Sequence, residues 1–159
     1  MRRAIILLLL ATYMFASGIK FKESRYIDAT GKTMNLKGEI EFAKDSITVS
    51  YIEPSKKILT VRGDTLTIQS ESGRETVDLS KNRQSAFYFS IFRSINEKNP
   101  DSFREFFEVA KSQNGYRLTP KSELKKSIVQ IVVKTLNDRP QNIKIELANG
   151  DKIEINAEN

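Results

Sequence analysis

Two glutamates on one predicted strand, Glu39 and Glu41, are the closest approach to a catalytic pair in this sequence. Paired carboxylates can hydrolyse glycosidic bonds when both face the same cavity. In the stretch GEIEF, however, Ile40 and Phe42 alternate with the two glutamates. Successive strand residues point to opposite faces of a sheet. We therefore expect the apolar side chains to face the core and the glutamates to face water.

The composition removes most other catalytic chemistry. The chain has no His and no Cys, which excludes a Ser-His-Asp triad, a cysteine nucleophile and a histidine-ligated zinc site. Its seven glycines form neither a dinucleotide-binding G-x-G-x-x-G pattern nor a phosphate-binding P-loop. We expect a binding protein rather than an enzyme, with no metal and no cofactor.

The N-terminus has the features of a secretory signal peptide. Arg2 and Arg3 precede a mostly apolar run over residues 4–15, and residues 16–18 are small enough for cleavage after Gly18. A retained signal anchor is the alternative, but the run is short for a membrane span of ~20 residues. We expect residues 1–18 to be a signal peptide and residues 19–159 to form a single domain that is soluble and periplasmic.

The charge pattern gives no sign of a nucleic-acid partner. The formal net charge is +6, of which the signal peptide contributes two charges, and Lys and Glu are interspersed along most of the chain. Interspersed charges are typical of solvated faces rather than of a basic stripe that binds phosphates. We expect no nucleic-acid partner, and we expect a monomer.

Most of the sequence after residue 38 alternates apolar and polar residues with a period of two, separated by turn signals such as Asn114-Gly115 and Asn149-Gly150. Short connections of this kind predict an antiparallel meander. The alternation predicts that one face of the sheet, the dry face, is turned away from water. The residues predicted on the dry face of the first strands are Ile40, Phe42, Ile47, Val49, Tyr51, Leu59, Val61, Leu66 and Ile68.

Residues 83–100 have helical rather than strand periodicity. Tyr88, Phe92 and Ile95 recur at helical spacing, and Phe89 widens the apolar stripe. We expect a helix that ends near Asn99-Pro100, followed by a helical turn and a strand from about residue 106. A curved sheet needs a cover for its concave face, and this segment is the candidate lid. Composition alone favours a closed core over a cavity.

Two blocks of the sequence resemble the periplasmic outer-membrane lipoprotein carrier family (LolA-type). The residues of the first block that carry the resemblance are Gly38-x-Ile40-x-Phe42, Pro54, Ile58-Leu59 and Gly63-x-Thr65-Leu66. This block departs from the family at Ala43, where the family commonly has an Arg that forms a hydrogen bond with the lid. The second block runs from residue 106 to the C-terminus and includes GYRLTPKS and NGDKIEIN.

The resemblance implies an incomplete antiparallel β-barrel with a short helical lid and an apolar interior that holds acyl chains. It also implies the partners: acylated lipoproteins, an inner-membrane ABC transporter that releases them and an outer-membrane receptor. On this basis the dry-face residues become the expected lipid-binding cavity, and Tyr88, Phe89, Phe92 and Ile95 become its lid. The alternative is an exported adaptor or structural β-domain with a closed core, which binds protein through a strand edge.

Overall fold

The computed structural model describes residues 18–158, apart from the side chains of residues 83–84 and 94–95. The predicted signal peptide therefore lies outside the described residues except for Gly18, and so does the side chain of Ile95. Eleven strands make up most of the described chain. They are β1 (Ile19–Ile27), β2 (Lys32–Phe42), β3 (Ser46–Glu53), β4 (Lys57–Arg62), β5 (Thr65–Ser70), β6 (Gly73–Asp78), β7 (Phe107–Ser112), β8 (Gly115–Pro120), β9 (Ile128–Leu136), β10 (Arg139–Leu147) and β11 (Lys152–Ala157).

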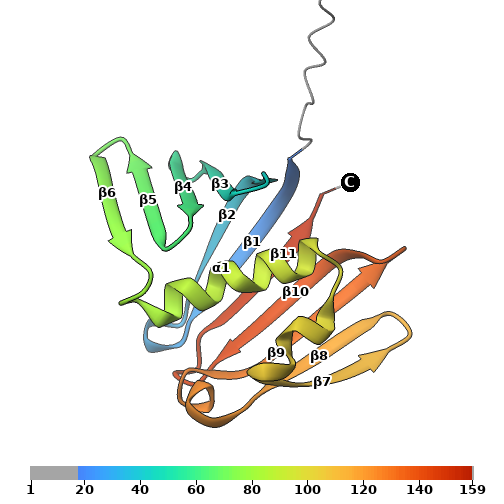
Figure 1. Ribbon diagram of the computed structural model, residues 1–159. Helices are drawn as coiled ribbons and strands as arrows, with labels where there is room; N and C mark the ends of the chain where they lie inside the picture. Colours follow the sequence, from blue (N-terminus) through green and yellow to red (C-terminus); the bar gives the residue numbers. More distant parts are fainter. Residues whose placement is uncertain (1–17, 159) are drawn as a thin grey trace, which may run out of the picture.

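All eleven strands belong to one antiparallel sheet with the order β6-β5-β4-β3-β2-β1-β11-β10-β9-β8-β7. The sheet is two meanders, β1 to β6 and β7 to β11, joined where β1 pairs with β11. It is curved and unclosed, with β6 and β7 at its two edges (Figure 1). The predicted mainly β class, a curved antiparallel sheet with a short helical lid, is confirmed.

The chain passes from one edge of the sheet to the other through α1 (Arg83–Asn96) and the 3₁₀ turn η2 (Pro100–Glu105). The helix therefore crosses the concave face (Figure 1). Two further 3₁₀ turns are η1 (Asp28–Thr30) and η3 (Ser122–Lys126). The sequence predicted the helix, the helical turn after it and the strand that begins at Phe107. None of the helices in the described part of the chain is long and apolar enough to cross a membrane.

The apolar faces of sheet and helix share one core. Ile47, Val49 and Val61 from the sheet pack in the same cluster as Phe89 and Phe92 from α1. The period-two prediction holds for these strands, because their alternate residues are buried. At the start of β9 the pattern fails: a register shift opposite Leu147 buries Ile128 and leaves Val129 exposed.

Candidate functional site: an apolar cavity beside the end of the helix

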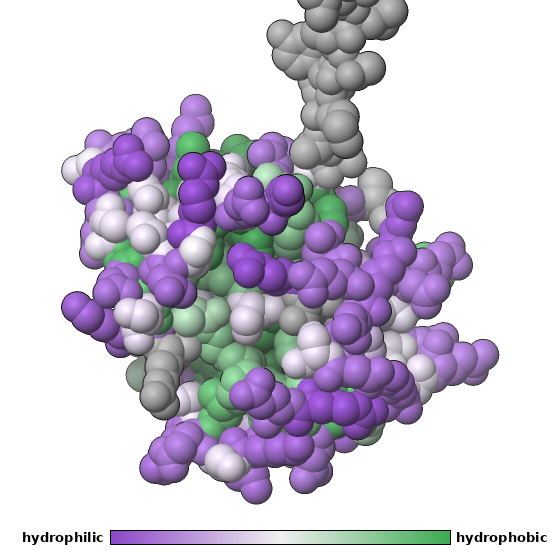
Figure 2. Space-filling model, viewed as in Figure 1, coloured by the Kyte–Doolittle hydropathy of each residue, from purple (hydrophilic) through white to green (hydrophobic). Residues whose placement is uncertain are grey.

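A cavity of about 540 Å³ lies between the C-terminal end of α1 and the adjoining ends of β1, β2, β10 and β11. Its size falls in the range of ~300–1,000 Å³ that is usual for pockets that hold small ligands. Figure 2 shows apolar residues in a hollow between the helix and the ends of β1 to β3, with hydrophilic residues over much of the surrounding surface. The apolar side chains that line the cavity include Ile19, Phe21, Ile40, Phe42, Phe92, Ile143 and Ile155.

Strand register stacks the lining residues in layers from the mouth inward. Ile19 is paired with Ile40, Phe21 with Gly38 in the next layer, and Ile155 with both Ile143 and Glu23. The absent side chain of Gly38 makes room for the Phe21 ring, because a Cβ there would meet Phe21 Cζ at 2.8 Å. It would also meet the Ser50 carbonyl oxygen at 2.6 Å, so the second layer depends on this glycine.

Three residues predicted for the site line this cavity: Ile40 and Phe42 from the sheet and Phe92 from the helix. Apart from Ile95, whose side chain is not described, the others pack in the core instead. Ile47, Val49, Tyr51, Val61, Leu66 and Phe89 are buried there, and Leu59, Ile68 and Tyr88 are partly buried against them.

Sequence reasoning missed four of the apolar lining residues, for two different reasons. Ile143 and Ile155 alternate with polar residues, but the cavity was assigned only to the first strands of the sheet. Ile19 and Phe21 lie in the N-terminal segment, where no strand was predicted. The stretch IKFKESRY does alternate, but its inward positions are Phe21, Glu23 and Arg25, so it lacks the apolar signature of a half-buried strand.

Glu23 and Arg25 form a polar cluster with Tyr51 next to the inner end of the cavity. The Glu23 side chain is fully buried, and its carboxylate accepts hydrogen bonds from Arg25 Nε and, at 2.9 Å, from the Tyr51 hydroxyl. Arg25 Nη2 donates to the Tyr51 hydroxyl at 3.0 Å. Buried charges are tolerated when they are paired and hydrogen-bonded in this way.

The tyrosines of this region titrate far above their usual range. Burial, together with the charge of Glu23, raises the pKa of Tyr51 to about 12. Burial also raises the pKa of Tyr88 on α1 well above its ordinary value, with Tyr51 and Glu23 adding to the shift. For Arg25, burial opposes the charged form, but the hydrogen bond and charge of Glu23 outweigh it and raise the pKa. The helix thus meets the polar cluster through Tyr88.

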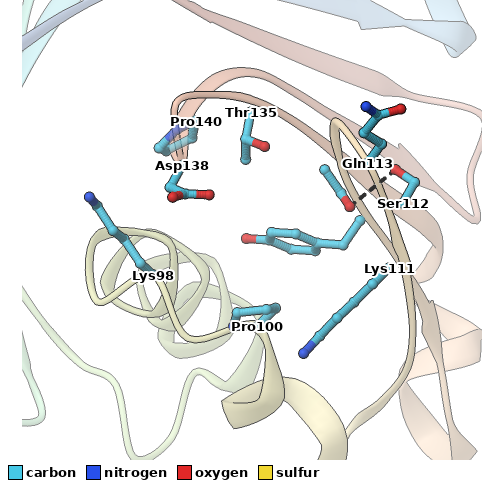
Figure 3. Close-up of a pocket in the computed structure, with 10 residues that line it drawn as sticks. Lys98, Pro100, Lys111, Ser112, Gln113, Thr135, Asp138 and Pro140 are labelled. Carbon is cyan, nitrogen blue, oxygen red and sulfur yellow. Dashed lines mark hydrogen bonds between the residues drawn. The ribbon is translucent and has the colours of Figure 1, made fainter.

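A second cavity of about 350 Å³ adjoins the first and shares Lys98 and Pro140 with it. Its walls combine polar and apolar surface in nearly equal parts, with Lys98, Pro100, Lys111 and Asp138 around it (Figure 3). Lys111 is held by an ion pair of 3.0 Å with Asp101. Within residues 18–158, no group of three or more His, Cys, Asp or Glu side chains could hold a metal ion.

Comparison with known proteins finds a similarity to a solved structure. No family model matches the chain, and no curated protein matches it. Among solved structures, the chain is similar to a LolA superfamily protein from Nitrosomonas europaea, with 11% sequence identity, a TM-score of 0.41 and coverage of 91% of this chain and 85% of that one. At this identity and TM-score, the similarity carries no argument.

Proposed function

We propose that this chain is a periplasmic carrier that binds the acyl chains of lipoproteins and takes them from the inner to the outer membrane, without enzymatic activity. The observation that carries the proposal is the apolar cavity between the helix and the sheet. The Phe and Ile side chains of its lining offer contacts to an acyl chain, and the lining also includes the charged residues Lys20, Lys98, Arg139 and Glu158. Its neighbours Phe89 and Ile91 keep the helix seated on the sheet.

Burial of an acyl chain supplies the binding energy. Each methylene removed from water contributes about 0.8 kcal/mol, so even part of a chain gives useful affinity. The cavity lies at one end of the sheet, and Ile19 in its lining is 41% exposed. A longer or branched lipid needs the helix to move outward from the concave face, which exposes more of the buried Ile and Val side chains.

The partners follow from the resemblance in sequence. A carrier of this kind receives its cargo from an inner-membrane ABC transporter and delivers it to an outer-membrane receptor. Support comes from the two blocks with family spacing, around Gly38 and around Leu118-Thr119-Pro120-Lys121. Gly38 lies on β2 and Leu118 on β8, whereas Pro54, Gly63 and Lys121 lie in the connections that follow β3, β4 and β8.

A second function, that of an adaptor with a closed core, is favoured by a different observation. The side chains of Ile47, Val49 and Val61 are already buried by their neighbours and line no part of the cavity. The two edge strands, β6 and β7, could each accept a strand from a partner protein. Under this reading the cavity at the end of the barrel has no ligand.

Displacement of a lipophilic dye by an acylated peptide separates the two functions. Under the carrier proposal, the acylated peptide displaces the dye and the same peptide without its acyl chain does not. Phe42→Glu places a charge at the cavity mouth and should weaken binding by at least about tenfold. Ile52→Glu is the matched control, because Ile52 lies on the adjacent strand β3 and is 55% exposed. Equal binding by both variants would place the ligand elsewhere.

A further inference from the structure

Along β1 the cavity ends one layer short of the polar cluster, whereas along β10 and β11 it reaches Ile143 and Ile155, which are in register with Glu23. Along β1, Ile19 and Phe21 line the cavity, whereas Glu23 and Arg25 do not. Phe21 separates the two regions, and its ring packs edge-on against Tyr51 with 5.8 Å between ring centroids. The cavity wall and the polar cluster are therefore in direct contact through these two rings.

The polar cluster also spans the interior from sheet to helix. Glu23 and Arg25 come from β1 and Tyr51 from β3, and the hydroxyl of Tyr51 is bonded to both charged groups. From the opposite side, Tyr88 of α1 lies close enough that Glu23, Arg25 and Tyr51 all affect its titration. An alkyl chain that pushed further inward would have to separate these groups and leave the buried carboxylate without partners, which is strongly unfavourable.

We infer that Glu23, Arg25 and Tyr51 form the inner stop of the cavity and limit the length of acyl chain that it admits. This inference rests on the proposed function, because it requires the cavity to hold an acyl chain. From Ile19 to Glu23 the strand rises by roughly 13 Å at about 3.3 Å per residue, and this is the depth open to the chain. The cluster therefore determines which chain lengths bind, by contact with the end of the acyl chain. It does not select the group attached to the head of the chain.

The test is the affinity of one peptide carrying octanoyl, decanoyl, dodecanoyl, myristoyl or palmitoyl chains, each measured below its aggregation concentration. Every methylene that enters the cavity should tighten binding by about fourfold. In the wild-type protein we expect this gain to stop at a chain length within the series. In Glu23→Ala/Arg25→Ala, which removes both charges together, we expect the gain to continue to longer chains.

Lys22→Ala/Ser24→Ala is the matched control, because these residues alternate with the cluster on the same strand and Lys22 forms an exposed ion pair with Glu158. In this control, the gain in affinity should stop at the same chain length as in the wild-type protein. A second measurement uses the wild-type protein alone, so it does not depend on the stability of a variant. A photoreactive group at the chain end should label Phe21, Ile143 or Ile155. It should not label Ile145 or Ile153, which lie one layer deeper, in register with Arg25.

The outcomes separate the inference from the function it rests on. Affinity that rises without a break in the wild-type protein, or labelling of Ile145, would overturn the inner stop while leaving the carrier proposal intact. The inner stop would also be overturned if the double alanine variant keeps its fold and its affinity stops rising at the same chain length as in the wild-type protein. Failure of every acylated peptide to bind would instead remove the proposed function.

Discussion

The Tyr51 hydroxyl donates a hydrogen bond of 2.9 Å to Oε2 of Glu23, inside an otherwise apolar half-barrel. The bond links β3 to β1 across the intervening strand β2. Arg25, also on β1, donates a second hydrogen bond to the same Tyr51 hydroxyl. The cluster therefore ties the N-terminal strand to the rest of the concave face at the point where the cavity ends.

Arg25→Met should destabilise the fold by about 2 kcal/mol, because it leaves the buried carboxylate of Glu23 with fewer hydrogen-bond donors. Urea unfolding measures the change. Lys37→Met is the control: it breaks the exposed ion pair of 3.0 Å between Lys37 and Glu53 and should change stability by less than about 1 kcal/mol. Equal losses in the two variants would mean that the buried pair is no more important than a surface one.

Tyr51 should make stability fall at alkaline pH. Its pKa is about 12 in the folded protein and near 10 when unfolded, so the folded state holds the proton more tightly. The contribution of this group is complete below pH 10 and is lost as the pH rises from 10 to about 12. The stability difference between wild type and Tyr51→Phe should therefore shrink by about 2 kcal/mol across that window. A difference that stays constant in urea unfolding there would contradict this prediction.

Gly38→Ala should destabilise the protein by about 1–3 kcal/mol, because the added methyl group overlaps the Phe21 ring and the Ser50 carbonyl oxygen. Phe21→Leu makes space on one of these two sides. In a double-mutant cycle, the cost of Gly38→Ala should therefore be smaller in the Phe21→Leu background. Additive costs would show that Phe21 is not what the glycine accommodates.

The strands and the helix were predictable because their periodicity is local. Ile47, Val49 and Tyr51 alternate within one strand, and Tyr88 and Phe92 recur within one helix. The local sequence therefore indicates which face of each element is buried. β1 could not be recognised in this way. Its inward side chains at Glu23 and Arg25 are polar, and the Glu23 carboxylate is buried because Arg25 and Tyr51, the latter from another strand, donate hydrogen bonds to it.

The position of the cavity could not be predicted from local pattern at all. It depends on the pairing of β1 with β11, whose residues Phe21 and Ala157 lie at opposite ends of the chain. It also depends on where the helix leaves part of the concave face uncovered. The sequence correctly placed Ile40 and Val49 on one face, but it could not separate Ile40, which lines the cavity, from Val49, which is sealed in the core.

The central claim is that the chain binds an acyl chain in the cavity between α1 and the sheet. The most direct measurement is native mass spectrometry of the protein mixed with a palmitoylated peptide and, separately, with the same peptide lacking its acyl chain. We predict a one-to-one complex with the palmitoylated peptide that is lost in Phe42→Glu and kept in Ile52→Glu. A folded wild-type protein that forms no complex, or forms it equally with the unacylated peptide, would contradict the account.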